Sequence, residues 1–311
     1  MKSLFTILLV VTVLSGCRKA EQPIAPETKT YLKEVLTLLE TKSVNRHKIN
    51  WPQFKADVLS HADSNKDTHA TIVYALQLLQ DPNSSFNTPK TDDFDNDTAQ
   101  PSTITETIPK NIGYLHLTGF PKDEDEIEMY RQHLIQQITA QDNRNVKGWI
   151  VDLRGNITGP LSPMLASIAP VLGNGTVGYF TDGNSSEPWI IENGKVQYGT
   201  TIIEDIYQFH QLKRNTPPVA VITDNTTRNS GEAIAVAFKS RPNTRSFGAS
   251  TYGHTSTNET YTLSDGATLT ITVAFFADRN QKEYRNGVTP DQESLPNQTI
   301  KAALTWLQKQ K

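Results

Sequence analysis

A turn between a predicted strand and a predicted helix carries the side chains best suited to nucleophilic chemistry. The stretch "TDNTTRNSGEAIAVAFKSRP", residues 223–242, reads as a strand end, a turn and a helix start. The first N–H groups of a helix have no intrahelical partner, and the helix dipole favours negative charge there. Acyl transfer to a serine needs such a position, a base, and two N–H groups for the oxyanion. The sequence leaves open whether the reactive position is Ser230 or its neighbour Asn229.

Other polar groups do not indicate a metal or a cofactor. The histidines show no metal-ligand spacing such as H-E-x-x-H. The acidic run from Asp123 to Glu128 stands at a predicted helix start, where it suits the dipole and is read as a solvated face. We therefore expect no metal and no cofactor. The chain contains seven histidines: His47, His61, His69, His116, His133, His210 and His254.

The elements that must position these groups alternate along residues 111–311. The apolar run from Trp149 to Val151 is typical of a strand buried on both faces. Strands that alternate with amphipathic helices indicate an α/β core rich in parallel strands. Strands are expected within 111–120, 146–156, 175–182, 217–225, 244–251 and 261–278, and helices within 125–141, 161–173, 230–240 and 299–310.

A separate helical unit is predicted before this core. In residues 28–86, apolar side chains recur at helical spacing, and three helices are expected to form a small cap. Residues 87–110 are polar, contain three prolines and show no periodicity, so they are predicted to be a linker. The first of the three helices is expected to bury one face made of Leu32, Val35, Leu36 and Leu39.

The N-terminus predicts export and lipidation. An apolar run over residues 4–14 is too short to span a bilayer comfortably and is typical of a signal peptide. The segment "LSGC" that ends at Cys17 resembles the bacterial lipobox, in which the cysteine is lipidated. We expect a lipoprotein signal peptide over 1–17 and a tether over 18–27. The alternative is an ordinary signal peptide with an incidental cysteine, or a buried free thiol.

Composition limits the remaining functions. Apolar residues make up 36% and charged residues 20%, as in soluble globular domains. The net charge is −3 without a basic stripe, so no nucleic-acid partner is expected. Cys17 is the only cysteine, which excludes an intrachain disulfide.

Six segments in order resemble the tail-specific, or C-terminal-processing, serine peptidases. The nearer likeness is to the branch without a PDZ insert, of the nisin-resistance-protein type. The resemblance covers about residues 30–310. It implies a crotonase-like αβ spiral with an N-terminal helical cap, and a tunnel between them for an extended peptide tail. The segments are "LQDPNSSF", "NIGYLHLTGF", "GWIVDLRGNITG", "VAVITDNTTRNSGEA", "FGASTYGHTSTNETYTLSDGATLTIT" and "GVTPD".

The resemblance assigns oxyanion and substrate contacts to the loop after the predicted strand at 146–156. The family's "DLR-x-N" motif is present and ends at Asn156. The Gly-Gly pair that follows in the family reads Thr158-Gly159 here, so only Gly159 keeps the freedom that the lack of a Cβ gives. The alternative is a loop turn with no catalytic part.

The resemblance offers two positions for the base. In the branch of the nisin-resistance type, a "D-x-H-S" motif supplies a histidine, and Asn83 stands there. An amide has no basic nitrogen near neutral pH, so Asn83 cannot act as a general base. In the PDZ-containing branch a lysine plays this part, and His254 stands where it would be. An imidazole with an intrinsic pKa of about 6.5 suits a base. The alternative is an exposed or hydrogen-bonded loop histidine.

The family pattern "T-x-S-x-x-E" moves the nucleophile position away from Ser230. With Glu232 as its Glu, the position three residues earlier is Asn229. A shift of one residue at a helix start turns a side chain by roughly 100°. Ser230 would then lend its backbone N–H to the oxyanion site, or would be an N-cap or first-turn serine.

These assignments predict a lipid-anchored member of the family that binds extended peptide or protein tails. It would face outside the cytoplasm of a bacterium, in the periplasm or at the cell surface. Asparagine at both catalytic positions, Asn229 and Asn83, predicts that peptide-bond hydrolysis is lost or weakened. The alternative is an active serine peptidase that uses Ser230 and His254. A third possibility is a structural envelope lipoprotein without a tunnel ligand.

Overall fold

The computed structural model describes residues 24–64, 67–88, 107–119, 121, 123–142, 146–206 and 209–310. The predicted signal peptide with Cys17, most of the tether and most of the linker lie outside these residues. Within the described ranges, no helix combines the length and the apolar character needed to cross a bilayer.

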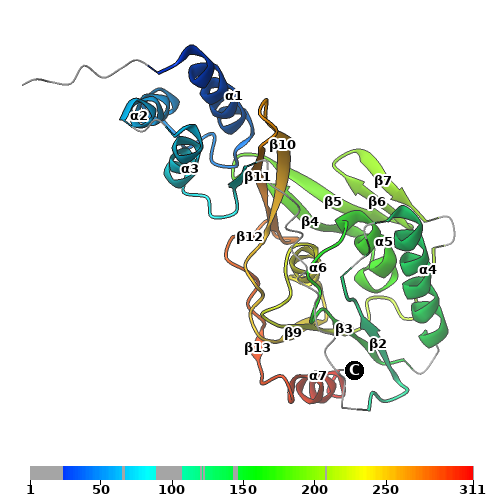
Figure 1. The fold of residues 1–311 in the computed structure, drawn as a ribbon. Helices are drawn as coiled ribbons and strands as arrows, with labels where there is room; N and C mark the ends of the chain where they lie inside the picture. The colour runs from blue at the N-terminus through cyan, green and yellow to red at the C-terminus, as the bar shows by residue number, and fades with distance from the viewer. Residues whose placement is uncertain are drawn as a thin grey trace, which may run out of the picture.

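Three helices form at the N-terminal end, as predicted. They are α1 (Pro26–Lys42), α2 (Trp51–Ser64) and α3 (Thr68–Leu79). Helix α1 begins within the predicted tether and buries the four expected side chains, Leu32, Val35, Leu36 and Leu39. The helices pack on one strand hairpin of the core, through a cluster that includes Leu263, Leu269 and Ile271 of that hairpin (Figure 1).

A five-stranded parallel sheet forms the base of the core. Its order is β13-β9-β8-β3-β2, and every neighbouring pair is parallel. Strands β3 and β8, two of the three inner strands, are buried along their whole length, because helices cover both faces. The strands are β2 (Ile112–His116), β3 (Gly148–Asp152), β8 (Val219–Thr223), β9 (Thr244–Gly248) and β13 (Gln292–Glu293).

Helices cover the two faces of this sheet unequally (Figure 1). Helix α7 lies alone on one face, where Ile300, Ala303 and Leu307 meet Ile150 and Ile222 of the strands. Alternate strand residues point to the other face and join a larger cluster with α4, α5 and α6. The four helices are α4 (Glu124–Gln141), α5 (Leu161–Leu172), α6 (Ser230–Phe238) and α7 (Thr299–Leu307).

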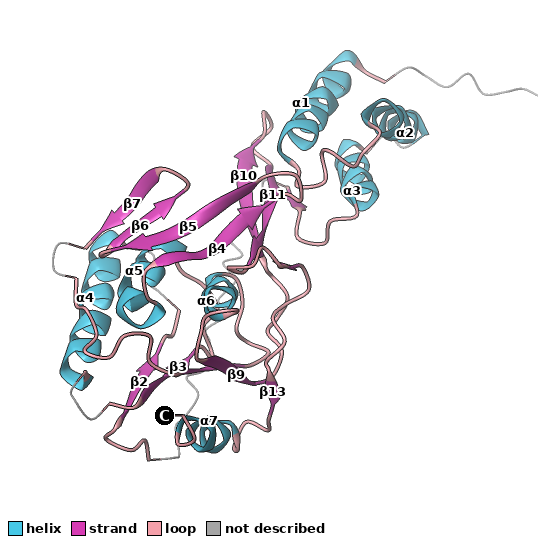
Figure 2. Ribbon diagram, turned by 180° about the vertical axis from the view of Figure 1, so that it is seen from behind, coloured by secondary structure: helices cyan, strands magenta, loops and turns pink. Residues whose placement is uncertain are grey.

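A second, eight-stranded antiparallel sheet lies beyond α5 and α6 (Figure 2). Three of its strands lie within residues 186–205, where no strand was predicted. The expectation of a parallel-rich core therefore holds for only one of the two sheets. Strand β11 pairs with β1, β4, β10 and β12 and joins the N-terminal helices to the core. The strands are β1 (Ser85–Asn87), β4 (Gly175–Thr181), β5 (Ser186–Glu192), β6 (Lys195–Tyr198), β7 (Thr201–Asp205), β10 (Ser256–Thr262), β11 (Thr268–Ala277) and β12 (Glu283–Tyr284).

Candidate active site

Asn229 occupies a sharp elbow between β8 and α6. Its backbone has φ 53° and ψ −118°, outside the regions that a residue with a Cβ normally adopts. Helix α6 begins at the next residue, Ser230. Strained backbone of this kind is held in place by its surroundings and is found at functional sites. The position that the sequence assigned to the nucleophile is therefore an elbow directly before a helix N-terminus.

The buried side chain of Glu232 fixes the elbow through hydrogen bonds. Its side chain is completely buried and accepts hydrogen bonds from the Asn229 N–H at 3.1 Å, the Thr251 hydroxyl at 2.5 Å and the Gly253 N–H at 2.7 Å. Burial raises the pKa of Glu232, while these hydrogen bonds act in the opposite direction. Because one carboxylate binds both segments, it fixes the loop that precedes His254 against the start of α6.

The loop after β3 turns its carbonyl oxygens toward the elbow. The Asn229 amide donates to the carbonyl oxygen of Ile157 at 2.9 Å. The Ser230 hydroxyl donates to the carbonyl oxygen of Gly159, whose φ is +140°. An oxyanion site needs N–H donors aimed at the reacting oxygen. In this arrangement the loop presents acceptors to both side chains, and the single hydroxyl proton of Ser230 is already donated.

Asn156 fixes the other end of the loop. Its amide donates to the carbonyl oxygens of Leu117 at 2.9 Å and Thr118 at 3.1 Å, and its own carbonyl accepts the N–H of Arg228 at 2.9 Å. A Cβ at Gly231 would lie 2.7 Å from the carbonyl oxygen of Asn156, so only glycine fits there without a shift. Asn156 thus ties β2, the loop and α6 together, and Thr158 lies further along the same loop.

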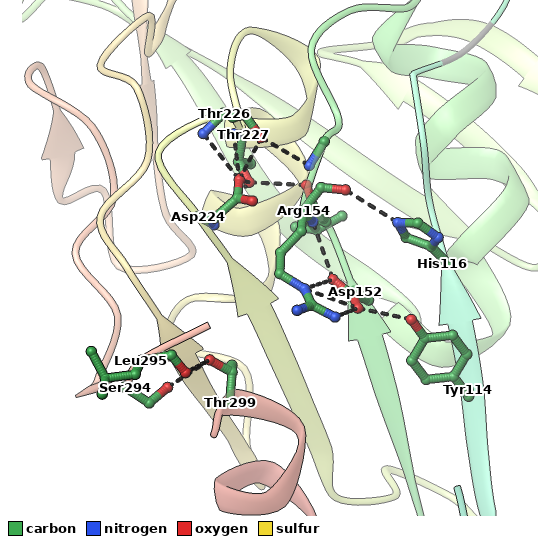
Figure 3. Close-up of polar contacts among 12 residues, drawn as sticks. Tyr114, His116, Asp152, Arg154, Asp224, Thr226, Thr227, Ser294, Leu295 and Thr299 are labelled. Carbon is green, nitrogen blue, oxygen red and sulfur yellow. Dashed lines mark hydrogen bonds and ion pairs between the residues drawn. The ribbon is translucent and has the colours of Figure 1, made fainter. Parts of the chain in front are cut away.

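A buried ion pair stands beneath the loop (Figure 3). Arg154 donates to Asp152 through Nε at 2.9 Å and Nη2 at 2.6 Å, and the Tyr114 hydroxyl donates to the same carboxylate at 2.8 Å. Hydrogen bonds with Asp152 raise the pKa of Arg154. Burial, together with the carboxylate, raises the pKa of Tyr114. Arg154 therefore stays protonated and bonded to Asp152, at the point where the loop leaves β3.

The turn after β8 is fixed by the side chain of Asp224 (Figure 3). This carboxylate accepts from the N–H groups of Thr226 at 3.0 Å and Thr227 at 3.1 Å. The Thr226 hydroxyl accepts the N–H of Gly155 at 3.0 Å, and the Thr227 hydroxyl donates to the carbonyl oxygen of Leu153 at 2.9 Å. The two loops that frame the elbow are thus bonded to each other.

Asn83 lies between α3 and β1, and β1 forms one edge of the antiparallel sheet. Its N–H donates to Asp81 at 3.0 Å, and its side-chain amide donates to the Ser256 hydroxyl of β10 at 3.2 Å. Within the described residues, Asn83 and Asn229 are not hydrogen-bonded to each other: the Asn83 amide donates to Ser256 and the Asn229 amide donates to Ile157. The two positions that the sequence singled out are placed by separate elements.

His254 follows the loop that Glu232 holds. Its ring packs edge-on against Tyr252, with ring centroids 4.6 Å apart. Burial lowers the pKa of His254, and the positive charge of Arg228 lowers it further. In the part of the chain that the structure describes, no hydrogen bond joins this imidazole to Ser230, whose proton goes to Gly159. The two side chains of the alternative pair are therefore not hydrogen-bonded to each other among the described residues.

A pocket of about 600 Å³ opens beside Asn83. Side chains of the α1–α2 loop, α2 and the end of α3 form one wall, and Phe275, Arg285 and Asn286 form the other. Its lining is rich in carboxamides: Asn45, Asn50, Gln53, Gln80, Asn83 and Asn286. Such groups offer both donors and acceptors, which suits a peptide backbone.

Sequence reasoning missed several of these residues. It used Glu232 only to count positions, although a Glu three residues after a helix N-cap is a known capping signal. Ser256, which holds Asn83, and Arg285, which lines the pocket, have no local sequence signal. Their roles depend on strands that pair across more than a hundred residues of chain.

The comparisons with known proteins place this geometry in a family. The model of peptidase family S41 matches residues 111–294. Nisin-resistance protein of Lactococcus lactis is 35% identical over 207 residues, which are 65% of this chain and 62% of that protein. The carboxy-terminal processing protease CtpA of Bacillus subtilis is 26% identical over 165 residues, which are 53% of this chain and 30% of that protein. The chain thus spans less than two thirds of these relatives.

Solved structures show the same fold. A lipoprotein from Streptococcus agalactiae superimposes with a TM-score of 0.65 at 22% identity, over 96% of this chain and 99% of that one. The photosystem II D1 C-terminal processing protease superimposes with a TM-score of 0.58 at 16% identity, over 88% and 94%. The predicted resemblance to tail-specific peptidases is confirmed: the chain belongs to peptidase family S41.

Proposed function

We propose that this chain binds extended peptide or protein tails, and that its peptide-bond hydrolysis is lost or strongly weakened. The observation that carries this proposal is the identity of the residue at the elbow. Asn229 stands before the helix start, where the resemblance requires a serine, and its amide is bonded to Ile157. A carboxamide is neither a nucleophile nor a base near neutral pH, and Asn83 is limited in the same way.

The loop carbonyls support the loss of catalysis. A substrate carbonyl that entered between Asn229 and the loop would meet the oxygens of Ile157 and Gly159. Oxygen facing oxygen repels the negative charge that develops in acyl transfer, whereas N–H groups would stabilise it. The N–H of Ser230, at the start of α6, is suited to that charge.

Peptide binding is supported by the pocket beside Asn83. We propose that residues 111–311 form a crotonase-like αβ spiral and that residues 28–86 are its cap, with residues 87–110 as the linker. The pocket lies where cap and core meet, and its carboxamides match the alternating donors and acceptors of an extended chain. Asn83 reaches this pocket, so a bound tail would pass the former base position.

We also propose that the mature protein is anchored by acyl chains on Cys17, outside the cytoplasm. The lipobox-like segment and the similarity to a lipoprotein structure support this location. Labelling of cells with an alkyne fatty acid should mark the wild-type chain and should not mark a Cys17→Ser variant. Labelling that persists in the variant would contradict the anchor.

Restoring the catalytic residues tests the proposed loss. We expect peptide hydrolysis by the Asn83→His, Asn229→Ser double variant and none by either single variant, because a serine without a base stays weakly nucleophilic. Cleavage of unfolded and tail-exposing peptides is followed by mass spectrometry. The same peptides should bind the wild-type chain in calorimetry. Absence of binding would favour a structural envelope lipoprotein instead.

A further inference from the structure

We propose that the pocket beside Asn83 contains a carboxylate-binding subsite formed by Lys48 and Arg285. This inference rests on the proposed function, because the carboxylate would belong to the bound peptide. It concerns what the pocket selects. Either a free C-terminus or an acidic side chain near the end of the peptide would supply the group.

The two cationic side chains approach the same turn, between β4 and β5. A Cβ at Gly183 in this turn would lie 3.9 Å from Lys48 Nζ, 3.9 Å from Arg285 Nη2 and 3.6 Å from Glu283 Oε1, the carboxylate that holds Arg285. Lys48 comes from the loop between α1 and α2, and Arg285 directly follows β12. Both residues line the pocket. A carboxylate near this turn would contact a cation from the N-terminal helices and a cation from the core.

The guanidinium of Arg285 is held by Glu283 and Phe275, and its Nη1 atom is left for a ligand. Its Nε and Nη2 donate to Glu283 at 2.8 and 2.5 Å, and its guanidinium stacks on Phe275 at 4.2 Å from the ring centroid. Among the described residues, neither Arg285 Nη1 nor the Lys48 ammonium has an acceptor. A guanidinium that is already oriented loses little freedom when it binds a carboxylate.

The charge of this cluster leaves room for one anion. Around the Gly183 turn there are three cations, Arg46, Lys48 and Arg285, and two carboxylates, Asp182 and Glu283. Arg46 pairs with Asp182 and Arg285 pairs with Glu283, so the charge of Lys48 stays uncompensated.

The other two acids of the pocket, Asp57 and Asp81, do not offset this charge by pairing with Lys48. Asp57 accepts the amide of Gln53 at 2.7 Å, and Asp81 accepts the N–H of Asn83 at 3.0 Å. These hydrogen bonds come from uncharged groups and do not cancel the charge of either acid, so the attraction for a ligand carboxylate is confined to Lys48 and Arg285.

The subsite adjoins the former base position. Phe275, which lies under Arg285, pairs across the ladder with Ser256, and Ser256 accepts the amide of Asn83. A carboxylate on Arg285 would therefore place the neighbouring peptide units beside Asn83. The pocket would then hold the end of a tail rather than the middle of a chain.

The test compares peptide pools that differ only in the carboxylate. The probes are N-terminally biotinylated random octapeptides without Asp or Glu, made as the free acid and as the C-terminal amide. A third pool is amidated and carries Glu at its last position. Binding to the full-length chain is measured by biolayer interferometry. We expect the free acid, the Glu pool or both to bind about fivefold more tightly than the plain amide, with a smaller ratio at high salt.

Substitutions assign the effect to the two cations. Lys48→Gln and Arg285→Gln should each remove most of the carboxylate advantage, measured as the ratio of the affinity for the free-acid or Glu pool to the affinity for the amide pool. Lys48 is exposed, so its substitution does not threaten folding. Lys282→Gln is the matched control, because Lys282 is exposed and packs over Tyr284 near β12, outside the pocket lining. It should keep the full advantage.

The outcomes separate the subsite from the proposed function. Equal binding of acid, Glu and amide pools would overturn the carboxylate subsite and leave peptide binding standing. An advantage that survives both substitutions would also overturn it. Failure of every pool to bind would overturn the proposed function and the subsite together.

Discussion

The elbow at Asn229 and the pocket beside Asn83 are both rich in polar side chains, but they differ in how many of their polar groups are hydrogen-bonded within the protein. At the elbow, the polar groups of Asn229, Ser230 and Glu232 already donate to or accept from protein groups. In the pocket, Lys48 and one edge of Arg285 have no acceptor among the described residues. The comparison shows that the side chains at the elbow are bound into the framework, while the groups without an acceptor among the described residues lie in the pocket.

The largest expected effect tests the framework beneath the elbow. Replacing Arg154 by Met leaves the carboxylate of Asp152, completely buried, without its cation. We expect a loss of about 3–5 kcal/mol in the free energy of unfolding, because breaking a buried pair strands a charge. Denaturant unfolding measures this. Lys195→Met, which breaks an exposed pair with Asp205 at 3.5 Å, is the control and should cost less than about 1 kcal/mol.

A smaller loss is expected from Gly231→Ala. The added Cβ would lie 2.7 Å from the carbonyl oxygen of Asn156, and backbone must move to admit it. Overpacking of this kind costs about 1–3 kcal/mol. The neighbouring Ser230→Ala variant adds no atoms and loses one hydrogen bond, so it should cost about 1 kcal/mol. Equal melting temperatures for the two variants would show that α6 is not closely packed against the loop at Asn156.

The pH dependence of stability distinguishes the elbow from an ordinary helix cap. Burial raises the pKa of Glu232 in the folded state above its ordinary value of 4.5. A raised folded pKa contributes stability that is complete below the ordinary value and is lost as the pH rises through the folded value. Relative to a Glu232→Gln variant, the wild type should therefore gain stability as the pH falls from 7 toward 4.5. Parallel stability curves for the two proteins would contradict this.

The smallest stability effects are expected from one substitution at the elbow and one in the pocket. Asn229→Ser removes the hydrogen bond to Ile157 and should cost about 0.5–1.5 kcal/mol. Hydrogen exchange of residues 157–159 should become faster, because this hydrogen bond holds the loop. In the pocket, Lys48→Gln should change the free energy of unfolding by less than about 0.5 kcal/mol. An equal effect of the two substitutions would remove the contrast between the regions.

The sequence predicted the elements of the fold better than their assembly. The parallel strands, the helices on them and the buried face of α1 follow from hydrophobic periodicity, which is a local property. Strands β5 to β7 were missed, because their alternation is broken by short turns and partly exposed positions. The antiparallel sheet depends on pairings such as β11 with β4, which no local pattern encodes.

The elbow at Asn229 was predicted in its position and not in its contacts. Counting from Glu232 located the elbow at Asn229, because the spacing within a helix start is fixed by helix geometry. The orientation of the loop after β3, whose carbonyl oxygens face Asn229 and Ser230, was not predictable. It depends on hydrogen bonds that Ile157 and Gly159 accept from side chains some seventy residues later in the chain. The cations of the pocket come from segments with no motif, and only the fold places Lys48 near Arg285.

The central claim is that the chain binds peptides without cutting them. Its most direct test incubates the purified wild-type chain with unfolded and tail-exposing peptides, alongside a Ser230→Ala variant, and analyses the products by mass spectrometry. The account predicts intact peptides in both reactions, with binding retained. Cleavage by the wild type that disappears in the Ser230→Ala variant would contradict it and would establish Ser230 as the nucleophile of an active peptidase.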